Sequence, residues 1–299
     1  MDFRSTDARG RITVIMLLIS ASALSMVACA EDMPPPNSEN IDICEPEVSS
    51  SDRDSCMIND GESVGIDKAD DLDILCTAEC DTINGISFQS VSGLETLGVL
   101  KGFSDIDQMS LISNPDLTTL EGLGGVEIPG GMSISGNNAL TSLAGVTEDE
   151  IVDLIITSND SLENLKGLES VKSIGMRRKP EVQYPLGKLE VAENENLKSL
   201  DGLNNVETLY RARIIDNESL ERINALSDVT VVEKHLTISD NPSLKSIESL
   251  MGIEKIEGGL GIQNNPSLPS CQVQEFLNNV EVNENYQVDV GNNGSGSCE

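Results

Sequence analysis

One stretch of sequence decides the fold of this chain, and it reads Ile156-Thr157-Ser158-Asn159-Asp160-Ser161-Leu162-Glu163-Asn164-Leu165-Lys166-Gly167-Leu168. Its pattern, an apolar residue three positions before an asparagine and apolar residues every third position after it, recurs along the chain. The asparagine of the pattern stands at Asn114, Asn137, Asn159, Asn194, Asn217, Asn241 and Asn265, with spacings of 23, 22, 35, 23, 24 and 24 residues. Self-similarity at such a period indicates a solenoid, in which each unit buries its apolar face only by stacking on its neighbours.

The spacing of the apolar residues changes at each asparagine. Before it, the positions five and three residues earlier are apolar in every unit, which is the alternation of a β-strand. After it, apolar residues fall every third position, as in Leu162, Leu165, Leu168, Val171 and Ile174. A period of three is typical of a chain that turns corners around a prism and points one side chain inward at each short step. We therefore predict an all-β solenoid of roughly 7–8 coils over residues 86–268.

The recurring asparagines are expected to be structural. A side-chain amide both donates and accepts hydrogen bonds, so it can satisfy backbone groups that a corner frees and repeat the same bonds in each coil. The alternative, in which these asparagines form a surface that contacts a ligand, is disfavoured by their fixed place in the pattern.

The repeat unit resembles the receptor L domain, the family that includes ligand-binding modules in the ectodomains of insulin and epidermal growth factor receptors and is similar to leucine-rich repeats. The block Asn265-Pro266-Ser267-Leu268-Pro269-Ser270-Cys271, followed by a short helix-like stretch and Cys298, also resembles the end of bacterial members. The resemblance covers about residues 64–299. It implies a right-handed single-chain β-helix, but it does not name a ligand, because this fold carries many binding roles.

The first 28 residues have the features of a signal peptide. Three arginines precede an apolar run over residues 12–28 that is short for a membrane span. The run ends in Met26-Val27-Ala28-Cys29, which resembles the bacterial lipobox and implies that Cys29 is lipidated and anchors the protein in the membrane; an ordinary secretory signal is the alternative. Ala30 at the next position implies the outer membrane or cell surface. Residues 29–51, rich in Pro, Ser, Asn and Glu, are expected to form a flexible tether.

Six cysteines remain once Cys29 is set aside, and an even number in an exported chain predicts disulfides. Cys271 and Cys298 are expected to pair, since they are the only two near the C-terminus. Cys44, Cys56, Cys76 and Cys80 allow three pairings, which stay open; a zinc site is the disfavoured alternative, because no CxxC pair is present. We accordingly predict a cysteine-rich N-terminal cap over residues 52–85 and a C-terminal disulfide cap over residues 269–299.

The composition is strongly acidic, with 51 acidic and 19 basic side chains and a net charge of -32. This charge argues against nucleic acid as a partner. A single histidine, and the lack of GxSxG and P-loop motifs, argue against an enzyme, so no catalytic residue, metal or cofactor is predicted. Paired carboxylates for glycoside hydrolysis stay open as the enzyme alternative, since only geometry could select a pair. Calcium also stays open, although no acidic cluster matches a known loop.

One region departs from the acidic composition, and we predict it as a binding patch. The 35-residue spacing places about 12 extra residues in the turn before the strand at Leu189. The patch consists of Arg177, Arg178, Lys179 and Tyr184 in this insertion, with Lys188, Tyr210, Arg211, Arg213 and His235. Lys188, Arg211 and His235 each lie six residues before an asparagine, so stacked coils would align them. The alternative is that neighbouring carboxylates such as Glu190 neutralise these cations and that the insertion is a tolerated loop.

These observations favour a lipid-anchored surface protein of the cell envelope that acts as a non-catalytic binding or scaffolding module. The expected ligand is a protein or an anionic glycan. A carbohydrate-active β-helix enzyme and a purely structural envelope protein are the alternatives.

Overall fold

The computed structural model describes residues 63–72, 75, 82–175 and 187–296. Within these residues the chain is an all-β fold built from two parallel sheets, with one α-helix and three 3-10 helices. The ten-stranded sheet has the order β1 (Val64–Ile66), β2 (Thr82–Gln89), β3 (Asp105–Ile112), β4 (Gly131–Ser135), β6 (Asp153–Thr157), β8 (Lys188–Ala192), β10 (Ala212–Ile215), β12 (Leu236–Ser239), β14 (Leu260–Gln263) and β16 (Val288–Gly291).

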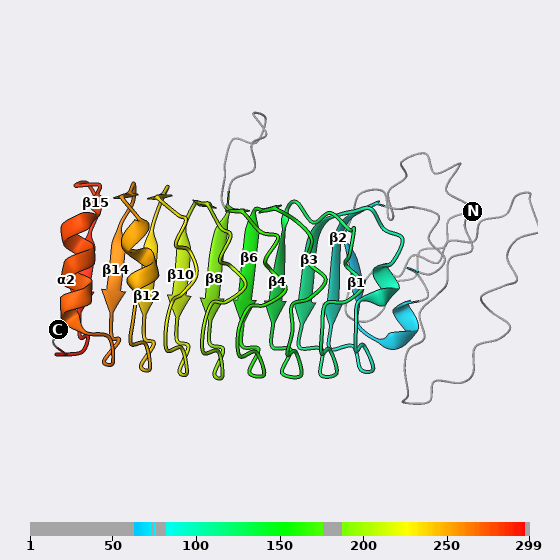
Figure 1. The fold of residues 1–299 in the computed structure, drawn as a ribbon. Coiled ribbons are helices and arrows are strands. Elements are labelled where there is room, and N and C mark those ends of the chain that lie inside the picture. The colour runs from blue at the N-terminus through cyan, green and yellow to red at the C-terminus, as the bar shows by residue number, and fades with distance from the viewer. Residues whose placement is uncertain (1–62, 73–74, 76–81, 176–186, 297–299) are drawn as a thin grey trace, which may run out of the picture. The chain divides into compact units, whose positions relative to one another are not determined.

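The six-stranded sheet is made of two-residue strands. Its order is β15 (Glu281–Val282), β13 (Lys255–Ile256), β11 (Val231–Val232), β9 (Thr208–Leu209), β7 (Ser173–Ile174) and β5 (Glu150–Ile151). The helices are α2 (Ser270–Asn279) and the 3-10 helices η2 (Ala69–Leu72), η3 (Gly98–Leu100) and η4 (Glu248–Gly252). Most of the fold thus consists of one long strand and one short strand per repeat, joined by turns (Figure 1).

Successive repeats pair in parallel and in register. Leu189 of β8 pairs with Ala212 of β10, which pairs with Leu236 of β12, which pairs with Leu260 of β14. We call each repeat, from its long strand to the next, a rung. Figure 1 shows the long strands from β2 to β14 side by side in the order of the sequence. Eight strands of this sheet, β2 to β14, lie in or overlap residues 86–268, where 7–8 coils are predicted, and β1 and β16 lie in the two predicted cap regions.

The core lies between the two sheets and is made of the apolar columns. Leu162, Leu165, Leu168, Val171 and Ile174 of one rung are all fully buried, as are the equivalent residues of the next rung. Each short step of the chain contributes one inward side chain. The inward side chains of one rung therefore pack against those of the next. Burial of apolar surface of this kind is the main favourable contribution to folding.

The asparagines form a continuous hydrogen-bonded ladder along this core. All seven are fully buried. In a representative rung, the Asn194 side-chain amide donates to the carbonyl oxygens of Ile156 (3.0 Å) and Ala192 (2.9 Å). Its Oδ1 accepts the backbone N–H of Asn159 at 3.0 Å. The ladder continues to an eighth member, Asn293, whose Oδ1 accepts from the backbone N–H of Asn265 at 3.2 Å.

A recurring glycine, in Leu-x-Gly-Leu or Leu-x-Gly-Val, permits close stacking. Gly122, Gly145, Gly167 and Gly202 each lie eight residues after a ladder asparagine and have φ between 109° and 124°. A Cβ at any of them would meet backbone atoms of an earlier rung at 1.9–2.2 Å. A larger residue therefore requires both an unfavourable backbone conformation and a shift of the neighbouring rung.

The extra residues of the long spacing lie between β7 and β8. Residues 176–186, which include Arg177, Arg178, Lys179 and Tyr184, lie outside the described residues. On either side, Gly175 and Gly187 are in contact, since a Cβ on Gly187 would lie 2.2 Å from the Cα of Gly175. The two ends of the insertion therefore lie at one point, and the rungs before and after it pair directly.

The two predicted cap regions contribute strands to the sheets. Residues 52–85 contain β1 and the start of β2, which pair in parallel. Residues 269–299 contain α2, β15 and β16, and these two strands end the six-stranded and ten-stranded sheets. Val273 and Phe276 of α2 are buried in the core.

Candidate functional site

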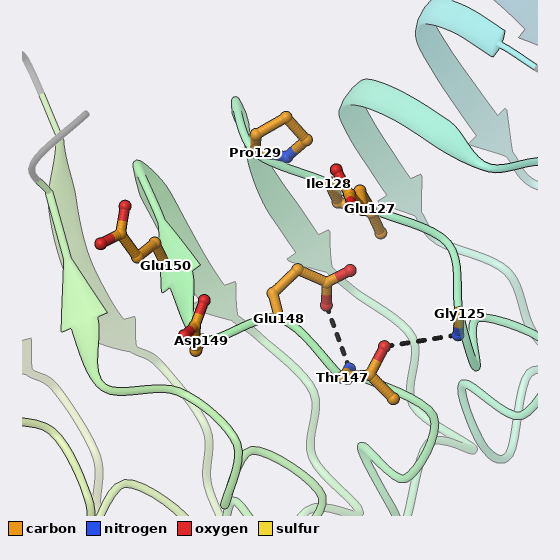
Figure 2. A pocket seen from close by; sticks show the side chains of 8 residues that line it. All are labelled: Gly125, Glu127, Ile128, Pro129, Thr147, Glu148, Asp149 and Glu150. Atoms are coloured by element: carbon orange, nitrogen blue, oxygen red, sulfur yellow. Dashed lines mark hydrogen bonds between the residues drawn. The ribbon is translucent and has the colours of Figure 1, made fainter. Parts of the chain in front are cut away.

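A recess of about 410 Å³ opens between two turns of neighbouring rungs. Residues 125–129 form one side and residues 147–150 form the other, with Gly125, Glu127, Ile128, Pro129, Thr147, Glu148, Asp149 and Glu150 in the lining. Figure 2 shows Glu148 extending between the two segments. The volume lies within the range of about 300–1,000 Å³ that is typical of ligand pockets.

The recess coincides with a gap in an apolar column. Counting in threes from Asn137 gives Leu140, Leu143 and Val146, and then Asp149. This rung is one residue shorter, however, and Ile151 pairs with Ile174, so the structural equivalent is Glu148. The other rungs have Val171, Val206, Val229 and Ile253 there, each with at most 1% of its surface exposed. Glu148 is half-buried and Asp149 is exposed, and the chain rejoins the core at Ile151 of β5. A polar turn therefore stands where other rungs bury an apolar side chain.

Glu148 is held by its own turn. One carboxylate oxygen, Oε2, accepts the backbone N–H of Thr147 at 3.1 Å, and the Thr147 hydroxyl accepts the backbone N–H of Gly125 at 3.4 Å (Figure 2). The other oxygen, Oε1, is buried and has no hydrogen-bond partner among the described residues. A buried acceptor without a donor is costly, so a ligand that supplies a donor would be favoured there.

Burial raises the pKa of the Glu148 carboxyl, and the negative charge of Glu127 raises it further. The backbone amides of Glu148, Thr147 and Ile128 oppose this shift, but they do not cancel it. The remaining acidic residues of the recess, Glu127, Asp149 and Glu150, are exposed. The site therefore combines a partly buried carboxyl that resists ionisation with a rim of solvated carboxylates.

This arrangement can accept hydrogen bonds and attract positive charge. Across the described ranges, no cluster of three or more acidic, histidine or cysteine side chains has the geometry of a metal site. The recess instead suits an organic cation or a group with several hydroxyl or amino donors, because carboxylates accept charge-assisted hydrogen bonds.

The residues predicted as a basic patch lie on neighbouring rungs. Leu189 donates its backbone N–H to the Arg211 carbonyl, and Ala212 donates to the His235 carbonyl, each at 3.0 Å. Lys188, Arg211 and His235 therefore occupy the same position in consecutive rungs, next to Leu189, Ala212 and Leu236, as their spacing predicts.

Several of these cations are paired with acids. Lys188 forms an ion pair with Glu190, whose other oxygen lies 3.0 Å from Nη1 of Arg213. Burial raises the pKa of Asp153 on the preceding rung, while the positive charges of Lys188 and Arg211 act in the opposite direction. The described part of the patch thus includes an ion-pair network, and the binding role predicted for the patch stays a prediction.

The described aromatic members of the patch, His235 and Tyr210, contact different residues. Nδ1 of His235 accepts the backbone N–H of Gly259 at 2.9 Å, and its ring meets Tyr286 edge-on with 5.4 Å between centroids. Tyr210 is half-buried and lies against Gly175, where its Cβ would be 2.4 Å from an added Cβ. Tyr286, which sequence reasoning missed, therefore accompanies His235.

Most predicted modification sites lie outside the described residues, namely Cys29, Cys44, Cys56, Cys76, Cys80 and Cys298. Cys271 is disulfide-bonded, and its pairing with Cys298 stays a prediction. None of the helices in the described ranges has the length and hydrophobicity needed to cross a membrane.

Comparisons of the sequence with models of protein families and with curated proteins find no match.

Proposed function

We propose that this protein is a non-catalytic binding module, held at the bacterial cell envelope by a lipid on Cys29. Its body is a right-handed single-chain β-helix with disulfide-bearing caps, and the recess around Glu148 receives a cationic group of a protein ligand. The lipobox-like sequence supports the anchor. In-register parallel strands that repeat about every 23 residues support the β-helix.

The observation that carries the binding role is the buried Oε1 of Glu148, which lacks a hydrogen-bond donor among the described residues. A lysine or arginine side chain entering the recess would supply that donor and would be attracted by Glu127, Asp149 and Glu150. The same contact would favour the ionised form of Glu148, so binding and ionisation of this residue are coupled.

Ligand capture with matched variants tests this proposal. The mature protein is used to capture partners from native envelope extract, and hits are titrated as purified proteins by calorimetry. Glu148→Gln and Glu150→Gln should each weaken binding at least about tenfold, which corresponds to roughly 1.4 kcal/mol. Glu218→Gln, which removes the same charge from an exposed position outside the recess, should bind as wild type does. Equal affinity in all four proteins would rule out the recess as the binding site.

Glycoside hydrolysis is a second candidate, because the same carboxyl favours it. A general acid requires a raised pKa, and burial gives Glu148 one beside three other carboxylates. Incubation with envelope and plant oligosaccharides separates the two candidates. Product release by wild type that is lost in Glu148→Gln supports hydrolysis, whereas ligand binding without product release supports the binding module.

A further inference from the structure

The last strand of the ten-stranded sheet, β16, extends the apolar columns of the core, but its apolar side chains are exposed. Val288 and Val290 pair with Leu260 and Ile262, which are 2% and 0% exposed. Val288 and Val290 are 42% and 41% exposed. Together with Tyr286 they are the exposed large hydrophobic residues of the described part of the chain. The apolar column therefore reaches an open end at the C-terminal side of the sheet.

The interior rungs also share a backbone hydrogen-bond pattern, which β16 leaves incomplete in the described sheet. In each, the first inward residue donates its N–H to the next rung: Leu236 donates to the Gly259 carbonyl and Leu260 to the Gln287 carbonyl, both at 3.1 Å. Val288 is the next residue of this column. No strand follows β16 in the described sheet, so the N–H groups of Val288 and Val290 face its outer edge. A free edge of this kind can pair with another strand.

Charge selects the kind of strand that fits. Asp289 lies between the two valines on the outward face, in the column that contains Glu190 and Arg213. Between two interior strands of the sheet, Glu190 of β8 faces Arg213 of β10, and their side chains are 3.0 Å apart. A second copy of this chain would bring another highly acidic protein to the edge, since the net charge is -32. A basic residue between two apolar residues reproduces the interior arrangement.

We propose that β16 is an interaction edge that binds, as an added parallel strand, an extended segment of another protein with the pattern apolar-basic-apolar. The backbone N–H and C=O groups of Val288 and Val290 supply the hydrogen bonds, their side chains pack against the apolar residues of the segment, and Asp289 pairs with its basic residue. Strand addition of this kind combines main-chain affinity with side-chain selectivity. This edge is separate from the Glu148 recess.

The chain itself supplies a defined probe for the edge. Residues 210–220 contain β10, with Arg213 between Ala212 and Ile214, and this segment pairs in parallel with an acid-bearing strand. A fluorescent peptide of this sequence is titrated with the mature protein, and anisotropy is recorded. The same peptide carrying Arg213→Glu is the charge control. We expect the first peptide to bind at least about tenfold more tightly than the second.

Two protein variants assign the binding to the edge. Val290→Pro removes an outward N–H without removing a bond to β14, and it should abolish binding. Asp289→Lys should reverse the preference between the two peptides, while Asp228→Lys, the same charge change at an exposed turn, should not. Thermal melting checks that each variant is folded, and Glu148→Gln should leave peptide binding unchanged.

Three outcomes overturn the proposal. Charge-selected strand addition would be excluded if wild type and Asp289→Lys each bound the two peptides equally well. It would also be excluded if wild type bound neither peptide. Concentration-dependent self-association that Val290→Pro abolishes would instead identify a second copy of this chain as the occupant.

Discussion

The backbone N–H of Asn159 donates a 3.0 Å hydrogen bond to Oδ1 of Asn194, although 35 residues separate the two. The same bond joins Asn137 to Asn159 across 22 residues and Asn217 to Asn241 across 24. The position of a residue within its rung, rather than its distance along the chain, therefore determines its partner. An insertion is accommodated when its two ends return to the same point of the stack.

Loss of a ladder asparagine should destabilise the fold strongly. Asn137→Ala removes the acceptor for the Asn114 backbone N–H (2.9 Å) and the donor to the Leu111 carbonyl (2.9 Å), and both groups are buried. We expect a loss of roughly 1–3 kcal/mol for each buried group left unsatisfied. Denaturant unfolding of the disulfide-intact protein measures this loss. Asn138→Ala, at the exposed neighbouring position, is the matched control and should change stability by less than about 0.5 kcal/mol.

Removal of the insertion should leave the stack intact. Because Gly175 and Gly187 are already in contact, deletion of residues 176–186 requires little rearrangement, and the paired strands β6 and β8 hold the junction. We expect the free energy of unfolding to change by less than about 1 kcal/mol. Circular dichroism and thermal melting of the deletion variant provide the check. Loss of the β-sheet signal would show that the insertion itself is needed to keep the rungs in register.

The stacking glycines should be far less tolerant than glycines at the surface. Gly202→Ala places a Cβ 1.9 Å from the Leu165 carbonyl oxygen at φ +120°, so the backbone of two rungs must move. We expect destabilisation of at least about 2 kcal/mol. Gly261→Ala is the control, because its Cβ would meet only the Thr237 side chain, at 3.7 Å. Similar melting temperatures for the two variants would contradict the close stacking.

The raised pKa of Glu148 predicts a defined dependence of stability on pH. A carboxyl whose pKa is higher in the folded state than in the unfolded state favours folding most at pH values below the unfolded pKa. That contribution is lost as the pH rises through the folded pKa. Glu148→Gln should therefore be more stable than wild type at about pH 7. The two proteins should be equally stable at about pH 3.5, where Glu148 is protonated in both the folded and the unfolded state. A variant that is less stable than wild type at neutral pH would contradict this assignment.

The periodic features of the sequence specify most of the β architecture. Columns such as Leu162 to Ile174 are readable because a parallel stack places the same position of every rung in the same environment, so the sequence repeats that environment. The rungs that contain β2 and β16 do not follow the asparagine pattern. Val91 stands where an asparagine is expected, although its N–H still donates to Asn114 Oδ1, and Asn293 is displaced by the intervening helix α2.

The recess could not be selected in the same way, because acidic residues occur throughout the chain. Glu148 differs from the exposed glutamates by its burial and by the turn that holds it, and these depend on contacts between rungs. One signal was present in the sequence, namely Glu148 three residues before Ile151, where the other rungs have valine or isoleucine. For the basic patch, sequence aligned Lys188 with Arg211, but Glu190 pairs with both Lys188 and Arg213.

Titration of the Glu148 side-chain carboxyl by carbon-13 NMR, with and without an arginine-containing peptide, tests the binding role most directly. In the free protein the pKa of this carboxyl should lie above its ordinary value, since burial raises it. A guanidinium bound in the recess should lower that pKa. A Glu148 resonance that titrates at the ordinary value and does not respond to the peptide would contradict the proposed ligand site.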